Sequence, residues 1–263
     1  MAQTISIHSY RGGTGKSNTS ANLAVLLARA GNRVGVVDTD IHSPGIHVVF
    51  GRAPSSFQRS LNDFLWGRCP VEEAAYDVTT TAIGQAAAED DHGPRIFLIP
   101  SSIKTGEIAR ILREGYDVAR LNDGFRELIR VLRLDFLLID THPGVNEETL
   151  LSIAISDAFV LILRPDQQDF QGTAVTLELA RKLDVRKILI VINKIPPAMD
   201  RELLRQQVED AYRAPVVGML PLSHEMAELA SGGLFVNRFP QHPLTRELSN
   251  VVAAIQDGSV GST

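Results

Sequence analysis

A glycine-rich loop near the N-terminus constrains the fold more than any other feature of this 263-residue sequence. The run Arg11-Gly12-Gly13-Thr14-Gly15-Lys16-Ser17 follows a short apolar stretch that predicts a strand, and a segment of helical period comes after it. Glycines allow such a loop to turn several N–H groups inward, and the N-terminus of the next helix adds positive potential. The lysine neutralises phosphate charge and the serine hydroxyl reaches Mg²⁺. The sequence therefore predicts a loop that binds a nucleoside triphosphate.

The rest of the chain alternates short apolar runs with longer stretches of helical period. The runs are nearly continuous in Ile, Leu, Val and Phe, which is typical of strands that are covered on both faces. We expect strands at 4–8, 33–38, 95–100, 135–140, 158–163, 187–193 and 215–220. We expect helices at 17–30, 105–113, 121–133, 173–183, 201–212 and 244–255. This order predicts an α/β fold with a doubly wound, mostly parallel sheet of seven to eight strands flanked by helices.

Composition excludes several other classes of protein. The 26 Lys and Arg residues against 31 Asp and Glu residues give a net charge of −5, so the whole molecule has no electrostatic reason to adhere to DNA or anionic lipid. One cysteine, Cys69, cannot form an internal disulfide or hold an iron–sulfur cluster within one chain. No apolar run is long enough for a membrane span, and the N-terminus lacks the pattern of a signal peptide. We therefore expect a cytoplasmic protein with one domain at 1–256 and a disordered tail at 257–263.

The loop departs from the standard phosphate-loop pattern, because Tyr10 stands where that pattern has its first glycine. Its basic residue, two glycines, variable residue and Gly-Lys-Ser resemble the deviant Walker A loop of the MinD/ParA family of ATPases. The segment 36–40, which ends in Asp38-Thr39-Asp40, is similar to the second-strand motif of that family. The segment 139–144 is similar to its Walker B and switch II motifs. The resemblance implies a P-loop NTPase of SIMIBI-like architecture that uses ATP/ADP and Mg²⁺.

The same resemblance implies a role for each motif residue. Ser17, Asp38 and Asp140 would hold Mg²⁺, and the backbone N–H of Gly144 would contact the γ-phosphate. Asp40 would orient the attacking water, so Lys16, Asp40 and Arg11 are the candidate catalytic residues. The expected nucleotide-binding residues are Arg11, Gly12, Gly13, Thr14, Gly15, Lys16, Ser17, Asn18, Gly144, Asn193, Pro221 and Leu222.

Arg11 occupies the place of the signature lysine of the family, which reaches the phosphates of the partner subunit's ATP. An arginine can do the same, because its planar fork can hold two phosphate oxygens at once. We therefore expect a homodimer with ATP sandwiched between the subunits. The alternative is that Arg11 points to solvent or to a surface carboxylate.

Two further parts of the sequence bear on which nucleotide is bound and on whether histidines take part in the chemistry. Asn193-Lys194-Ile195 is followed by Pro196, so the aspartate that reads guanine in Asn-Lys-x-Asp proteins is missing and ATP is favoured over GTP. His142 stands where relatives commonly carry a small residue, and we interpret it as structural rather than catalytic. The histidines between 42 and 47 have no metal-ligand companions at a recognisable spacing.

The resemblance predicts a switch ATPase that hydrolyses ATP slowly until a partner protein stimulates it, and that positions a DNA locus, a division site or a large assembly. No motif in the sequence indicates whether it works at the nucleoid or at the inner membrane. The arginines between 110 and 133 are interleaved with acidic residues, and the stretch 244–255 carries only Arg246 as a cation, which favours core packing over a lipid anchor. Two alternatives stay open: an ATP-dependent small-molecule ligase of the dethiobiotin-synthetase type, and an ATP-binding scaffold with little turnover.

Overall fold

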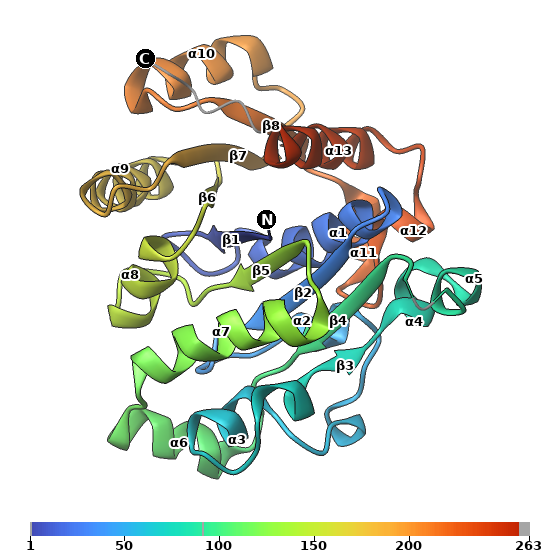
Figure 1. The fold of residues 1–263 in the computed structure, drawn as a ribbon. Helices are drawn as coiled ribbons and strands as arrows, with labels where there is room; N and C mark the ends of the chain where they lie inside the picture. The colour runs from blue at the N-terminus through green and yellow to red at the C-terminus, as the bar shows by residue number, and fades with distance from the viewer. Residues whose placement is uncertain (1, 91, 258–263) are drawn as a thin grey trace.

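The computed structural model describes residues 2–90 and 92–257, and an eight-stranded sheet runs through its centre (Figure 1). The strand order is β3-β4-β2-β5-β1-β6-β7-β8, and every neighbouring pair is parallel except β3 with β4. The strands are β1 (Gln3–His8), β2 (Arg33–Asp38), β3 (Tyr76–Asp77), β4 (Arg95–Ile99), β5 (Phe136–Asp140), β6 (Ala158–Leu163), β7 (Lys187–Ile195) and β8 (Val216–Pro221). The predicted doubly wound, mostly parallel sheet is confirmed.

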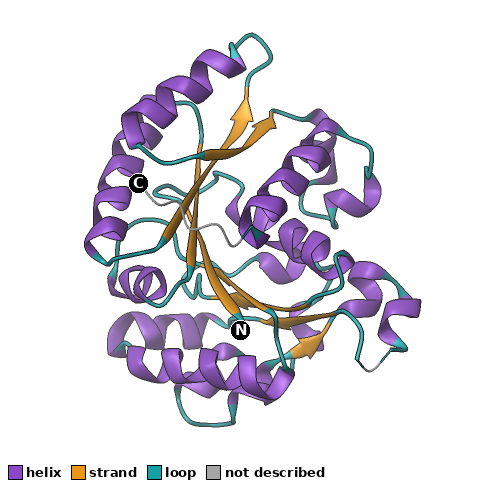
Figure 2. Cartoon of the chain, turned by 45° about the horizontal axis from the view of Figure 1, so that its top comes forward, coloured by secondary structure: helices purple, strands orange, loops and turns teal. Residues whose placement is uncertain are grey.

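Helices cover both faces of this sheet (Figure 2). One face carries α1 (Lys16–Arg29) and α13 (Pro243–Gln256), and the other carries α7 (Val118–Leu132), α9 (Gln167–Lys182) and α10 (Arg201–Tyr212). The remaining α-helices are α2 (Ile46–Val49), α3 (Leu61–Leu65), α4 (Thr79–Ile83), α5 (Gln85–Ala88), α6 (Thr105–Glu114), α8 (Glu147–Ala154), α11 (His224–Leu229) and α12 (Phe235–Arg238). Short 3₁₀ turns lie at Pro54–Ser56 and Val71–Ala74.

The core is divided by the sheet because successive side chains of a strand point to opposite faces. In β2, Val36 packs into the cluster under α1 and α13, whereas Val37 packs into the cluster under α7. A third cluster lies between α9, α10 and the strands β6 to β8. Both faces of the central strands are therefore buried, as their continuous apolar sequence predicts.

Several expected boundaries are wrong. The helix expected from residue 173 begins at Gln167, because the side chain of Asp166 accepts a hydrogen bond from the N–H of Asp169 and caps it. The helix expected from residue 121 begins at Val118, after the capping side chain of Asp117. The antiparallel edge strand β3, the helix α8, the short helices between residues 46 and 88, and the helices α11 and α12 were not predicted. Apart from Asp257, the expected tail lies outside the described residues.

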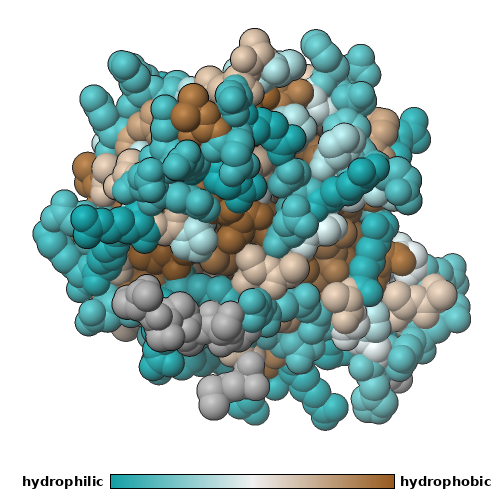
Figure 3. All heavy atoms as spheres, turned by 90° about the horizontal axis from the view of Figure 1, so that it is seen from above, coloured by the Kyte–Doolittle hydropathy of each residue, from teal (hydrophilic) through white to brown (hydrophobic). Residues whose placement is uncertain are grey.

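The last helix packs into the core rather than presenting an apolar face. Its stripe of Leu244, Leu248, Val251, Val252 and Ile255 is buried. Seen from the side of α10 and α13, hydrophilic side chains cover most of the surface, with small apolar areas between them (Figure 3). Across residues 2–90 and 92–257, no helix is long and apolar enough to cross a membrane.

Candidate nucleotide-binding site

The predicted phosphate-binding loop connects the end of β1 to the start of α1, at the carboxyl edge of the sheet. Gly13 and Gly15 have positive φ angles of 76° and 94°, which side chains other than glycine rarely adopt. A Cβ on Gly15 would also lie 2.4 Å from Nδ2 of Asn193. Glycine is therefore required at position 15 both by the backbone conformation and by the close approach of β7.

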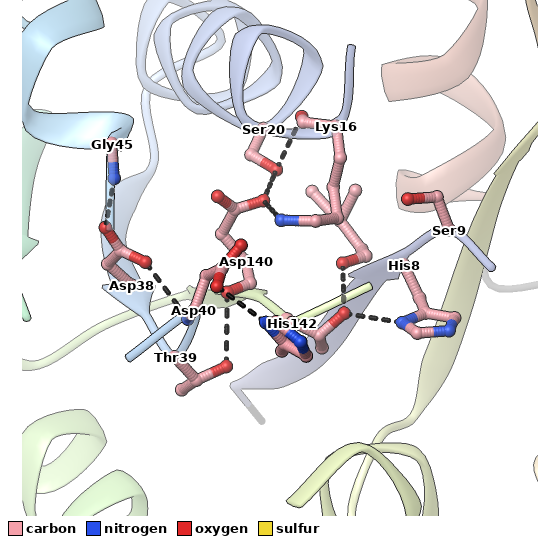
Figure 4. A network of polar contacts seen from close by, with 12 residues as sticks. His8, Ser9, Lys16, Ser20, Asp38, Thr39, Asp40, Gly45, Asp140 and His142 are labelled. Atoms are coloured by element: carbon pink, nitrogen blue, oxygen red, sulfur yellow. Dashed lines mark hydrogen bonds and ion pairs between the residues drawn. The ribbon is translucent and has the colours of Figure 1, made fainter. Parts of the chain in front are cut away.

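Lys16 is held at the bottom of this loop by a buried ion pair. Its Nζ lies 2.8 Å from Oδ1 of Asp140, and the hydroxyl of Ser20 donates to the same oxygen over 2.9 Å (Figure 4). Lys16 is 6% exposed and Asp140 is fully buried. Because β5 ends at Asp140, the strand places this carboxylate under the loop, and the predicted Walker B residue meets the loop lysine directly.

Asp38 and Asp140 meet the electrostatic requirements of a Mg²⁺ site. They are register partners at the ends of the parallel strands β2 and β5, and both are fully buried. Burial and then the neighbouring charge of Asp140 raise the pKa of Asp38 well above its ordinary value. Oδ2 of Asp140 is buried and has no hydrogen-bond partner within the described residues. A divalent cation would compensate both carboxylates, and Ser17, half-buried beside Lys16, lines the adjoining cavity.

Asp40 lies beyond the end of β2 and lines a cavity of about 260 Å³ together with the loop residues. Its Oδ1 is 2.7 Å from Nδ1 of His142 and accepts a further hydrogen bond from the N–H of Ser43 over 3.2 Å. The predicted water-orienting residue is therefore beside the predicted phosphate site. The sequence did not indicate that a histidine would contact it.

The switch segment after β5 is bonded to the end of β1. Gly144 has a positive φ of 87°, and its N–H donates to the carbonyl of Ser9 over 3.2 Å. If this N–H contacts a γ-phosphate, as expected, its hydrogen bond to Ser9 must first break. Earlier in the same segment, the hydroxyl of Thr141 donates to the carbonyl of Ile7 over 3.0 Å, which is a second bond between this segment and β1.

Arg11 lies against the start of α9 rather than over its own phosphate-binding loop. Its guanidinium donates to Oε1 of Gln168 and lies 3.9 Å from carboxylate oxygens of Asp166 and of Asp169. Its side chain is 40% exposed. Within one chain, Arg11 thus pairs with a surface carboxylate, which is the alternative stated above. Its contact with the phosphates of a second chain remains a prediction.

A cavity of about 370 Å³ opens on the other side of the loop, next to β7, β8 and α11. It is lined by the predicted nucleotide-binding residues Asn193, Pro221 and Leu222, together with Gly13, Gly15 and Asn18 from the loop and α1. The wall also contains residues that the sequence did not indicate: Thr19, Lys194, Leu220, Ser223, Met226, Ala227, Ala230, Ser231, Leu244 and Leu248. The wall is mostly apolar, which suits a flat heteroaromatic base.

Two residues of β7 hold the phosphate-binding loop itself. The amide Nδ2 of Asn193 donates to the carbonyl of Thr14 over 2.7 Å, and its Oδ1 accepts from the N–H of Lys194. The ammonium of Lys194 donates to the carbonyl of Gly13 over 2.7 Å. Asn193 is one of the predicted nucleotide-binding residues. Because the loop uses one N–H of Nδ2 and Lys194 uses one lone pair of Oδ1, the second N–H and the second lone pair are left for the edge of a base.

Comparisons with known proteins agree with this geometry. The ParA family model described as NUBPL iron-transfer P-loop NTPase matches residues 1–256. The chain is 25% identical over 259 residues to an uncharacterized ATP-binding protein of Methanocaldococcus jannaschii, which covers 97% of this chain and 88% of that protein. It is 27% identical over 240 residues to the iron-sulfur cluster carrier protein of Pseudomonas fragi, with 87% and 76% covered. Septum site-determining protein MinD of Pyrococcus horikoshii, complexed with Mg-ADP, shares the fold with a TM-score of 0.78 at 21% identity, over 98% and 97% of the two chains.

Proposed function

Because this chain belongs to the ParA family of P-loop NTPases, we propose that it binds Mg-ATP and hydrolyses it to ADP and phosphate as a dimerising switch. The observation that carries the proposal is the assembly of Lys16, Asp38 and Asp140 under one glycine-rich loop, with Asp40 at its rim. Phosphoanhydride hydrolysis needs charge neutralisation and a positioned water, and this arrangement offers both.

The loop and its lysine bind the phosphates in this proposal. The N–H groups from Gly12 to Ser17 turn toward the anion, and Lys16 moves from Asp140 to the phosphate oxygens. Asp38, Asp140 and Ser17 are the residues that would hold Mg²⁺, and the bound ion would supply further neutralisation of phosphate charge. ATP is the preferred nucleotide because the guanine-reading aspartate is replaced by Pro196.

Asp40 orients the attacking water. It lines the same cavity as the phosphate-binding loop, and its carboxylate can accept the hydrogen bond of a water molecule.

Arg11 acts on a second copy of the chain. Its guanidinium is on the surface beside the loop, so a facing subunit could offer its phosphates to that guanidinium once the contacts with α9 are exchanged.

The biological use that we propose is spatial organisation: the nucleotide-bound dimer positions a DNA locus, a division site or a large assembly, and a partner protein stimulates hydrolysis. The name of the Pyrococcus horikoshii protein, septum site-determining protein MinD, supports this assignment. Some of the basic residues of α6 and α7 are paired with acidic residues of the same helix, as in Arg110 with Glu114 and Arg130 with Glu127, which favours a protein partner over DNA at that face.

The test is the oligomeric state of the Asp40→Ala variant in light scattering with ATP and with ADP. We expect a dimer with ATP only, because ATP binding is kept and turnover falls by about 100-fold or more. Arg11→Ala is the matched variant: it should bind ATP as a monomer and fail to dimerise. A wild-type rate in Asp40→Ala, or an ATP-dependent dimer of Arg11→Ala, would contradict the proposal. Phosphate release only with an added small carboxylate or amine would favour the ligase alternative.

Iron–sulfur cluster carriage is a second candidate, favoured by the description of the family model and by the Pseudomonas fragi relative. The one cysteine is buried in the core cluster that contains residues of α3 and α7, and burial raises the pKa of the Cys69 thiol, which disfavours the thiolate that a cluster needs. Reconstitution with iron and sulfide distinguishes the two: a visible absorption band that Cys69→Ala abolishes would support cluster carriage.

A further inference from the structure

His142 and Asp40 are brought together by neighbouring strands although they are 102 positions apart in the sequence. Asp40 follows β2 and His142 follows β5, and the two side chains point toward one another (Figure 4). The distance from Nδ1 of His142 to Oδ1 of Asp40 is 2.7 Å. An ionised carboxylate only accepts hydrogen bonds, so the imidazole donates its Nδ1–H.

The two oxygens of the Asp40 carboxylate are used differently. Oδ1 accepts from His142 and from the N–H of Ser43, which is 3.2 Å away. Oδ2 accepts no hydrogen bond from any described residue, and Asp40 lines the cavity beside the phosphate-binding loop. One oxygen is therefore fixed, and the other is left to accept a bond from a water molecule.

The histidine is itself held on both sides. The backbone before it is anchored because the N–H of Thr141 donates to the carbonyl of Ile7 over 3.2 Å. The ring of His42 meets the ring of His142 edge-on, with centroids 4.7 Å apart. The Nδ1–H of His142 thus comes from a fixed position, which is what a positioning group requires.

We propose that His142 is a positioning residue, which holds the carboxylate of Asp40 where it orients the attacking water. This inference rests on the ATPase function proposed above and adds a residue to it. A displacement of about 1 Å at a reacting group can cost about 100-fold in rate, so the loss of this hydrogen bond acts on turnover rather than on nucleotide binding.

The experiment compares four proteins in steady-state ATP hydrolysis: wild type, His142→Ala, His142→Asn and His142→Gln. The amide nitrogen of Asn lies as many bonds from Cα as Nδ1, whereas that of Gln reaches as far as Nε2. We expect His142→Ala and His142→Gln to lower kcat by about 10- to 100-fold with an unchanged KM for ATP. His142→Asn should stay within about threefold of wild type. His92→Ala is the matched control, because His92 is exposed and its hydrogen bond to Asp90 comes from the backbone N–H that alanine keeps.

The outcomes separate the inference from the function on which it rests. A wild-type kcat in His142→Ala, or equal losses in the Ala and Asn variants, would overturn the positioning role while leaving ATP hydrolysis intact. If the wild type does not hydrolyse ATP, or Asp40→Ala hydrolyses it normally, the proposed function is wrong. Melting temperatures then still test the contact: His142→Ala and Asp40→Ala should not lower Tm additively in the double variant, and additive losses would overturn it.

Discussion

The two sides of the phosphate-binding loop are built on different principles. The phosphate side (Lys16, Asp38, Asp40, Asp140 and His142) consists of charged or polar groups, most of them buried. Lys16 bonds to Asp140 over 2.8 Å, and His142 bonds to Asp40 over 2.7 Å. The base side is a mostly apolar cavity beside β7 and β8. A change on the phosphate side leaves a buried charge without its partner, whereas a change on the base side removes contact area. The first should affect folding and turnover together, and the second should affect affinity alone.

The largest expected effect is that of Lys16→Met. This variant removes the cation from Asp140, whose other neighbours are Ser20 and the second carboxylate Asp38. Breaking a buried ion pair costs about 3–5 kcal/mol in the free energy of unfolding, and ATP hydrolysis should fall to background. Urea unfolding measures the first effect. The exposed Lys182→Met is the control, with a change below about 0.5 kcal/mol. An unfolding free energy of Lys16→Met equal to wild type would remove the distinction between the two sides.

A smaller effect is expected from pH, through His8 beneath the phosphate side. The hydroxyl of Thr141 donates to Ile7, so it accepts the Nδ1–H of His8 over 2.7 Å. Nε2 of His8 is buried and has no hydrogen-bond partner in the part of the chain that the structure describes. Burial, with a contribution from the charge of Lys16, lowers the pKa of His8 from 6.5 to about 3.

The sign follows from proton binding. Between pH 6.5 and about 3 the unfolded chain binds a proton at His8 that the folded chain does not. The unfolding free energy therefore decreases as the pH is lowered through this range. The slope is about 1.4 kcal/mol per pH unit, so the unfolding free energy at pH 5 should be about 2 kcal/mol lower than at pH 7. His8→Asn keeps a donor for Thr141 and should lose this slope. Denaturant unfolding of both proteins at pH 7 and pH 5 measures it, and parallel losses would contradict the assignment.

The smallest effect is expected on the base side, from Leu222→Ala. Leu222 lines the cavity and is 52% exposed, so its truncation leaves no void in the core. The lost apolar contact corresponds to about 1 kcal/mol, or about a fivefold increase in KM for ATP with kcat unchanged. Leu203→Ala, on the exposed face of α10, should change neither constant. A fall in kcat for Leu222→Ala would show that the two sides are coupled.

The sequence predicts the main strands well because each is a continuous apolar run, and it predicts helix starts less well. Asp166 and Asp117 cap α9 and α7, and both caps are visible in the sequence as an Asp before the first turn. The apolar period begins later than the cap in each case, so periodicity alone gives starts that are too late. The edge strand β3 has two residues and no periodicity to detect.

The candidate site is predictable where its residues share one local motif. The loop from Arg11 to Ser17 and the strand-end carboxylates follow from such motifs. The pairing of His142 with Asp40 does not, because it depends on β2 lying beside β5. The contact of Asn193 with Thr14 depends in the same way on where β7 ends. Long-range contacts set by strand order are therefore what the sequence leaves undetermined.

The bonds from β7 to the loop carbonyls have a consequence for the entropy of binding. The side chains of Asn193 and Lys194 donate to the carbonyls of Thr14 and Gly13, so the backbone of the loop is ordered when the chain folds. Ordering a residue of free backbone costs about 1–2 kcal/mol, and here most of that cost is met before any nucleotide arrives. The loop is thus a preorganised receptor, and nucleotide binding should carry only a small loss of backbone freedom.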